Sequence, residues 1–182
     1  MGRKALKMSM FGGQRRRAGV RLVAGSAILA GAAAAMIVSG GGAASAAPTS
    51  CTAAHGANVV QVSGSSACGA KADVFSSAHA EDRSGAGSAV AVAATNGNAN
   101  AYNLNAGSTA LSSALSGGTA QSISIGGLSV AQARNGGTSV AIAGAGTRAY
   151  AGPDGARCEG LAFSYDSSTS QACVLGLQVL VP

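Results

Sequence analysis

Aromatic and charged side chains are scarce in this chain of 182 residues. It has no tryptophan, three tyrosines and three phenylalanines, and only 10% of its residues are charged. The formal net charge of +6 comes from the N-terminal 46 residues, because residues 47–182 carry five basic and six acidic side chains. A nucleic-acid-binding domain needs a basic face and aromatic rings that stack on bases. The composition therefore excludes nucleic acid as an expected partner.

Acidic side chains are absent from residues 1–46, which have the features of a secretory signal peptide. Seven basic side chains lie within residues 3–21, an uncharged stretch runs from Leu22 to Ser39, and Ala44 and Ala46 are the small residues of a cleavage site. We expect cleavage after Ala46, which leaves residues 47–182 as the mature chain. The uncharged stretch approaches the ~20 residues that span a bilayer, but its alanines and glycines partition weakly into lipid. We expect a protein that is secreted or held in the cell envelope, and membrane-bound only if the leader is uncleaved.

Cysteine pairs with zinc-site spacing are also absent, since the chain contains no C-x₂-C motif. All four cysteines, Cys51, Cys68, Cys158 and Cys173, lie in the expected mature chain, where oxidation would form two disulfides. Four cysteines allow three pairings. We favour Cys51 with Cys68 and Cys158 with Cys173, because each pair brackets a short β-like stretch, as a stapled hairpin would. Closing each loop would stabilise the fold by about 3 kcal/mol.

Large apolar residues are few as well. Residues 47–182 contain 24 valines, isoleucines, leucines and phenylalanines, about 18% of that segment, slightly below the ~20% level at which a packed core becomes doubtful. A net charge close to zero does not fit a disordered chain either. We therefore expect a single domain over residues 47–182 with a thin core of small side chains, stabilised by disulfides.

The expected fold is mainly β. Residues 84–151 are rich in glycine, alanine, serine and asparagine and carry apolar pairs at a spacing of two: Val90 and Val92, Ile123 and Ile125, Leu128 and Val130, Val140 and Ile142. This alternation predicts short strands, each with one buried face, separated by glycine-rich turns. An interior filled by alanine and serine favours a β-solenoid or roll. The turn spacing shows no fixed period, so a compact β-sandwich stays open.

The flanking segments, residues 47–83 and 152–182, are expected to form stapled ends around their cysteine pairs. Strands are expected over residues 58–63, 72–80, 161–165 and 172–181, with a turn over residues 166–169. One stretch of the central tract has a helical alternative. Leu104, Leu111 and Leu115 would share a helical face, with Ser108 as the cap and Gly117 as the end, although a loop fits this short segment as well.

Several short motifs are similar to a known family. They are Ala46 to Cys51 (AAPTSC), Ala67 to Ala70 (ACGA), Ser77 to His79 (SAH), Gly127 to Ala131 (GLSVA), and the final cysteine pair. In these motifs the chain resembles a family of small exported proteins from mycobacteria and their actinobacterial relatives that carry a domain of unknown function. The resemblance covers nearly the whole mature chain. It implies export and the cysteine frame, and it implies no activity.

Two glycine motifs could indicate chemistry. Gly144-x-Gly146-x-x-Ala149 follows the expected strand 138–143, in the order of a dinucleotide-binding turn, but Pro153 arrives too soon for the helix that such a site needs. Gly127-x-Ser129-x-Ala131 is one residue short of a nucleophile elbow. A serine hydrolase would also have to use His55 or His79 as its base. Chance matches explain both motifs better in a tract so rich in glycine.

The densest polar cluster is His79-Ala80-Glu81-Asp82. A strand would place His79 and Glu81 on one face, where they could bind a metal with Asp73 or Asp82, but two ligands do not make a site. A run of asparagines could form a polar ladder for carbohydrate, ice or a second copy: Asn96, Asn98, Asn100, Asn103 and Asn105. Solvent exposure and turn formation explain both features more simply.

We expect an exported, noncatalytic binding or structural module, extracellular or associated with the envelope. The sequence assigns no catalytic, cofactor-binding or metal-binding residue and identifies no specific partner. The alternative is a secreted hydrolase or metal-dependent enzyme that uses His79 and the neighbouring acids. A third hypothesis is self-association through the small-residue β tract.

Overall fold

The computed structural model describes residues 47–181. The expected signal peptide and its cleavage site lie outside the described residues. The described chain forms fifteen β-strands and no helix, so none of its segments is a helix that could cross a membrane. The strands are β1 (Thr49–Ala54), β2 (Asn58–Ser63), β3 (Ser66–Ala72), β4 (Ser77–Asp82), β5 (Ser88–Ala94), β6 (Asn98–Asn103), β7 (Thr109–Leu115), β8 (Thr119–Ser124), β9 (Leu128–Ala133), β10 (Thr138–Ala143), β11 (Arg148–Gly152), β12 (Gly155–Glu159), β13 (Ala162–Asp166), β14 (Gln171–Val174) and β15 (Leu177–Leu180).

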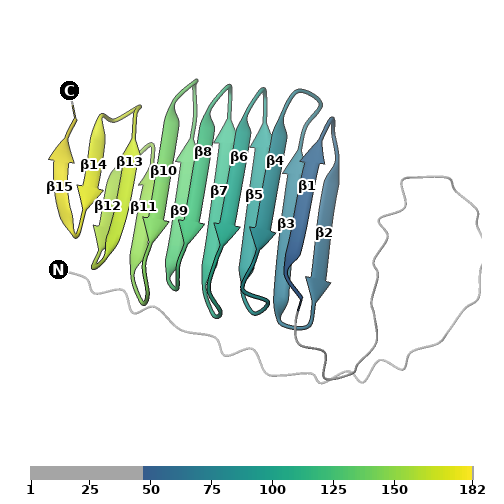
Figure 1. Ribbon diagram of the computed structural model, residues 1–182. Helices are drawn as coiled ribbons and strands as arrows, with labels where there is room; N and C mark the ends of the chain where they lie inside the picture. Colours follow the sequence, from purple (N-terminus) through teal and green to yellow (C-terminus); the bar gives the residue numbers. More distant parts are fainter. Residues whose placement is uncertain (1–46, 182) are drawn as a thin grey trace, which may run out of the picture. The chain divides into compact units, whose positions relative to one another are not determined.

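The strands form two sheets that face each other, and the chain passes back and forth between them (Figure 1). Sheet A has the order β1-β4-β6-β8-β10-β13-β14-β15, and sheet B has the order β12-β11-β9-β7-β5-β3-β2. Within each sheet the central strands are parallel, and each pairs with the strand one coil later. This arrangement is a β-solenoid of about four turns. The expectation of a mainly β solenoid is confirmed, and the sandwich alternative is not observed.

Both ends of the solenoid are closed by antiparallel strands. At the start, β1 pairs with β4 and β2 with β3; at the far end, β12 pairs with β11, and β13, β14 and β15 follow β10 as a meander. Figure 1 shows β1 and β2 at one end of this unit and β14 and β15 at the other. Sheet A therefore extends further than sheet B at the C-terminal end.

Most side chains between the sheets are small, and the larger ones that are fully buried, Asp82, Asn103 and Asp166, lie at the ends of strands. Inward positions alternate with outward ones along each strand, and the fully buried hydrophobic residues are alanines and cysteines. The valines, leucines and isoleucines of the central tract lie on the outward faces, for example Val90 and Val92 on β5 beside the buried Ala89 and Ala91. The expected strands are present, but the apolar pairs occupy the face opposite to the buried one. Alanine fits because the sheets lie too close together for larger side chains.

The helical alternative over residues 104–117 is wrong. Leu111 and Leu115 lie on β7, where they alternate with the buried Ala110, Ser112 and Ala114. This period of two places the leucines on the outward face of sheet B. A helix, with its period of 3.6, would not place Ala110, Ser112 and Ala114 together on one buried face. The glycine at the next corner, Gly118, stands where an added Cβ would lie 2.7 Å from the carbonyl carbon of Ala133 in the adjacent coil.

Both disulfides are present, Cys51–Cys68 and Cys158–Cys173. They do not staple hairpins. Each joins sheet A to sheet B across the interior, because Cys51 and Cys173 belong to sheet A, and Cys68 and Cys158 to sheet B.

The two disulfides occupy the ends of one pair of interior rows. Cross-strand partners in sheet A run Cys51, Ala80, Ala101, Ser122, Ala141, Ser164 and Cys173, and those in sheet B run Cys68, Ala89, Ala110, Ser129, Ala149 and Cys158. Near the middle, the Ser122 and Ser129 hydroxyls are 2.8 Å apart, so a hydrogen bond joins the rows there. The same positions that carry alanine in the coils thus carry cysteine at the ends.

Candidate functional site

The structure places His79 and Glu81 together on the outward face of β4. The Nε2 atom of His79 lies 3.7 Å from Glu81 Oε2, and its Nδ1 lies 2.9 Å from the hydroxyl of Thr52. Arg83 donates two hydrogen bonds to the Glu81 carboxylate, at 2.8 and 3.0 Å. Arg83 consequently lowers the pKa of Glu81, and the positive charge of Arg83 already balances the negative charge of this carboxylate.

Asp82 does not join this cluster, because it points into the solenoid. Its carboxylate is fully buried and accepts hydrogen bonds from Ser66 (2.6 Å), Asn103 (2.8 Å), Ser84 and the Gly87 amide. Burial by itself would raise the pKa of Asp82, but the donors Ser66, Ser84 and Asn103 lower it overall. The role of Asp82 is structural, since it holds the corner between β4 and β5.

The other acid considered with this cluster, Asp73, lies in the turn before β4. It accepts hydrogen bonds from the amides of Phe75 (3.2 Å) and Thr95. Within residues 47–181, no group of three or more histidine, cysteine, aspartate and glutamate side chains is placed to hold a metal ion. The second histidine, His55, lies in the turn after β1, where its φ is 54°.

Ser129 is enclosed between the sheets. It is fully buried, its hydroxyl accepts a hydrogen bond from the Ser122 hydroxyl, and it donates to the carbonyl of Ala141 at 2.7 Å. His79 lies on an outward face, so the sheet separates the two side chains. The glycine motif at residues 144–149 forms the turn between β10 and β11, and a strand follows it where a dinucleotide site requires a helix.

The asparagine run is divided by the strand period. Asn98 and Asn100 lie on the outward face of β6, where Asn100 donates to Asn98 at 2.6 Å and Asn98 donates to Ser77 at 2.8 Å. Asn103 is buried and bonded to Asp82. Asn96 and Asn105 lie in the turns on either side of β6. Only two of the five therefore belong to an outward polar row.

A groove lies at the C-terminal end of the described chain. It has a volume of about 420 Å³, and we call it the C-terminal groove. Its floor is apolar, with Leu128 and Val130 from β9, and the Cys158–Cys173 disulfide lies along it. The remaining lining residues are Arg148, Ala149, Tyr150, Arg157, Glu159, Gly176 and Gln178.

Tyr150 lines this groove and lies between Val130 and Arg157 in the strand register. An added Cβ at Gly152 would lie 2.6 Å from the Tyr150 hydroxyl, so the missing side chain at Gly152 lets the tyrosine ring lie along the sheet. Burial first, and then the nearby Asp154, raise the pKa of Tyr150. A tyrosine hydroxyl is protonated at neutral pH even without this shift, so it can donate a hydrogen bond to a ligand.

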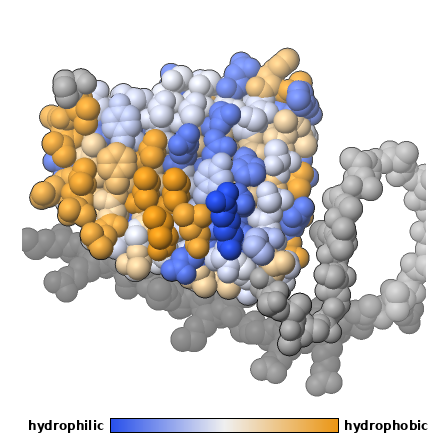
Figure 2. Space-filling view, in the orientation of Figure 1, coloured by the Kyte–Doolittle hydropathy of each residue, from blue (hydrophilic) through white to orange (hydrophobic). Residues whose placement is uncertain are grey.

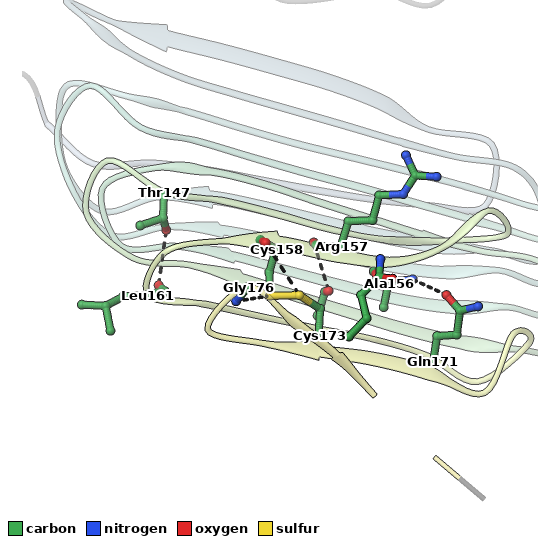
Figure 3. Close-up of a disulfide and its surroundings, with 10 residues drawn as sticks. Thr147, Ala156, Arg157, Cys158, Leu161, Gln171, Cys173 and Gly176 are labelled. Carbon is green, nitrogen blue, oxygen red and sulfur yellow. Dashed lines mark hydrogen bonds between the residues drawn. A yellow bond between two sulfur atoms is a disulfide. The ribbon is translucent and has the colours of Figure 1, made fainter. Parts of the chain in front are cut away.

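Two guanidinium groups border the groove. Arg148 stands opposite Glu159 in the strand register, and Arg157 stands opposite Tyr150. Neither arginine belongs to an ion pair among residues 47–181. Figure 3 shows the Arg157 side chain extending away from the disulfide and the strands around it. The groove thus combines an apolar floor with positive charge at its border.

The hairpin β14–β15 forms one side of the groove and is fixed to β12 by side chains. Gln178 Nε2 donates to the carbonyl of Ala156 at 3.2 Å. Gln171 Oε1 accepts from the Ala156 amide at 3.4 Å (Figure 3). The Gly176 amide lies 3.2 Å from Cys158 Sγ. These contacts occupy free backbone groups of β12, the last strand of sheet B.

Sequence reasoning missed this groove. Its residues come from five strands, β9, β11, β12, β14 and β15, and from the turn at Gly176, and they span residues 128–178 of the sequence. The available signal was the coil period, because Leu128, Arg148 and Glu159 occupy one row, and Val130, Tyr150 and Arg157 the next. The number of residues between successive apolar pairs in the sequence is irregular, and this irregularity concealed the coil period.

The fold and its surface define a class of protein: a two-sheet β-solenoid with an interior of alanine and serine, a disulfide at each end, and a groove beside the second one. The chain belongs to DUF6764, a family of unknown function, whose model matches residues 15–176. No curated protein matches the chain, and no solved structure matches it.

Proposed function

We propose that this protein is an exported, noncatalytic binding module that holds its ligand in the C-terminal groove. The observation that carries the proposal is the inverted distribution of side chains. The fold buries alanine, serine and cysteine, and it displays its larger apolar and aromatic side chains on outward faces. A protein that leaves such residues outside has apolar surface available for a partner.

The groove favours a ligand with an apolar body and an acidic group. Leu128, Val130 and the Tyr150 ring would contact the apolar part. Arg148 and Arg157 would bind a carboxylate or phosphate, for which a guanidinium has the geometry. Glu159 lies on the same border and would disfavour ligands with several negative charges. A single acidic group attached to an aliphatic chain satisfies these requirements.

Export is supported by the leader and by the cysteines. Residues 1–46 have the charge and hydropathy pattern of a secretory signal, and both disulfides require an oxidising compartment to persist. The resemblance of several motifs to those of small exported actinobacterial proteins also supports export, and it supports an actinobacterial origin. Peptide mapping without reduction, on protein recovered from medium and envelope, tests this part: an N-terminus at Ala47 supports it, and an intact leader in the envelope opposes secretion.

Ligand binding can be tested with two probes of equal chain length and opposite charge. Decanoate and decyltrimethylammonium would each be titrated into oxidised residues 47–182, with NMR chemical shifts and calorimetry as readouts. We expect decanoate to bind, with shifts at Tyr150 and its neighbours, and the cation to bind at least tenfold more weakly. Equal binding of both probes would show that the arginines do not select the ligand.

Matched arginine variants locate the site. Arg148→Gln with Arg157→Gln should weaken decanoate binding about tenfold or more, the size of one or two lost charge-assisted hydrogen bonds. Arg134→Gln, in the turn after β9, is the control and should bind as the unaltered protein does. The enzymatic alternative predicts a different result: hydrolytic activity that His79→Ala abolishes.

A further inference from the structure

The last strand, β15, is an uncovered apolar edge of sheet A. Among residues 47–181 it pairs only with β14, and all four of its residues are exposed. Leu177, Val179 and Leu180 expose 72%, 50% and 78% of their surface. Residues 171–181 contain no charged residue and no proline. Natural edge strands usually carry charge, proline or a bulge that prevents pairing with another chain. β15 carries neither a charged residue nor a proline.

The outward side of sheet A changes character along its length. One row of cross-strand partners runs Glu81, Tyr102, Ile123, Ile142, Phe163, Val174 and Leu177. The row is polar near β1 and becomes apolar from β8 to β15. Figure 2 shows hydrophobic side chains gathered over the end of the molecule that carries β10 and β13–β15, with hydrophilic ones toward the middle. The apolar surface therefore continues to the free edge.

The other sheet edges differ from β15. Gln171 and Gln178 occupy backbone groups of β12, as described above. The first strand of sheet A, β1, has Ser50 and Thr52 on its outward side. On β2, Val60 and Val62 are also exposed, and an apolar row runs from Val60 through Gly69 to Val90, Leu111 and Val130, but Val59 of this strand packs against the core. β15 differs from β2 in that all four of its residues are exposed.

The hydrogen-bonding register of β15 is defined. The Val181 amide donates to the carbonyl of Ser170 at 2.9 Å, and in an antiparallel pair the bonded residues alternate. Leu177 and Val179 therefore bond to β14, and the backbone groups of Gln178 and Leu180 point to the free edge.

We propose that β15 pairs with β15 of a second copy, forming a two-fold symmetric dimer. An antiparallel pair centred on Val179 would place Gln178 opposite Leu180 of the second copy, and this pair would exchange both backbone hydrogen bonds, as would its symmetry mate. The two sheets A would become one continuous sheet.

The second copy is favoured by the match of surfaces. In this dimer Val179 meets Val179 of the second copy and Leu177 lies opposite its Val181, so the apolar rows of the two copies join. A head-to-tail contact of β15 with β1 would instead place these side chains beside Ser50 and Thr52 of the next copy. A two-fold contact also closes the assembly, whereas the head-to-tail contact would continue as a filament. The absence of charge over residues 171–181 leaves no repulsion between the copies.

The test is the mass of oxidised residues 47–182 in solution, measured by sedimentation and light scattering from micromolar to near-millimolar concentration. We expect a monomer–dimer equilibrium with twice the chain mass at the upper end. Val179→Lys would place two like charges at the two-fold axis, so this variant should be monomeric at every concentration. The matched control is Val62→Lys on β2; Val62 is exposed as well (63%, against 50% for Val179), and this variant should still dimerise.

A covalent trap tests the register directly, including the case in which the lysine variant fails to fold. Val179→Cys should form an intermolecular disulfide on mild oxidation, because the two Val179 positions face each other in a close, non-hydrogen-bonded pair. Peptide mapping should find the 179–179 link, and Val62→Cys should give none. A monomer at every concentration, a dimer that persists in a folded Val179→Lys variant, or a filament would each overturn the proposal. Binding of decanoate in the C-terminal groove is measured separately, so a failure of the dimer proposal can be distinguished from a failure of the ligand-binding proposal.

Discussion

Most inward positions within the strands of this fold carry a methyl or a hydroxymethyl group, and the larger buried side chains Asp82, Asn103 and Asp166 lie at strand ends. Ala91, for example, is completely buried on β5, and its neighbours along the interior row are Ala70 and Ser112. The buried serines donate across the gap, as Ser112 does to the carbonyl of Ala120 at 2.8 Å. Residue size, rather than hydrophobicity, therefore decides which face of each strand is buried.

We expect Ala91→Leu to destabilise the protein strongly and Val92→Leu to have little effect. The added methylenes at residue 91 would push the sheets apart, which costs about 3 kcal/mol or more, at the upper end of values for overpacked cores. Val92 is outward and has space. Chemical denaturation followed by circular dichroism measures the difference. Similar free energies of unfolding for the two variants would show that the sheets can separate at low cost.

The acid stability of the fold depends on Asp82 in particular. Its pKa is lower in the folded protein than in the unfolded chain, because the donors Ser66, Ser84 and Asn103 outweigh the effect of burial. A carboxyl shifted in this direction contributes stability above its unfolded pKa of about 3.9, and the contribution is lost as the pH falls through the folded value.

Asp82→Asn should therefore lower the free energy of unfolding by about 2 kcal/mol at pH 7, the size of one or two charge-assisted hydrogen bonds. It should also reduce the loss of stability below about pH 4. Some acid dependence should remain, because Arg83 lowers the pKa of Glu81 as well. Denaturation at a series of pH values measures this. Asp154→Asn, at an exposed turn, is the control; if its pH profile changes as much, Asp82 is not the responsible group.

At the scale of elements, the sequence predicted the positions of many strands well, but it predicted poorly which face of each strand is buried. Residues 58–63 and 138–143 are strands with the expected bounds. The expected strand over residues 172–181 is instead a hairpin, β14 and β15, with a turn at Leu175 and Gly176. Alternation identifies a strand but not its buried face, because here the larger apolar residues are the outward ones.

The corners between strands depend on glycines that face the next coil. Gly118→Ala should destabilise the protein by at least about 2 kcal/mol, because the new methyl would lie 2.7 Å from backbone of Ala133. Gly69→Ala is the matched control. Its methyl would contact only the Val90 side chain at 3.9 Å, so this change should be neutral or slightly stabilising. Thermal denaturation of both variants measures the effect, and equal melting temperatures would mean that the coils move apart easily.

For the whole molecule, the coil length is the property that sequence reasoning did not find. Cross-strand partners are separated by 21 residues from Ser88 to Thr109, by 19 from Thr109 to Leu128 and by 20 from Leu128 to Arg148. The variable turns conceal this near-constant period, while the inward rows of alanine, serine and cysteine preserve it. The groove and the cross-sheet disulfides could be predicted only once the period was known.

A solenoid with this period should accept an extra coil. Duplicating residues 98–118 inserts one complete coil, since Asn98 and Thr119 are direct partners. We expect this variant to fold with equal or higher stability, because solenoid stability is close to a sum over coils and their contacts. Duplicating only residues 98–108 should abolish cooperative unfolding, since β7 would then have to join sheet A. Circular dichroism and denaturation distinguish the outcomes, and a stable half-coil variant would contradict this register.

The alanine-filled interior also has a thermal consequence. Unfolding changes the heat capacity in proportion to the apolar area that it exposes, and backbone exposure acts in the opposite direction. A fold that buries methyl groups and many backbone hydrogen bonds therefore has a small heat-capacity change for its length. Its stability curve is correspondingly flat, so the protein loses little of its folding free energy on either cooling or moderate warming.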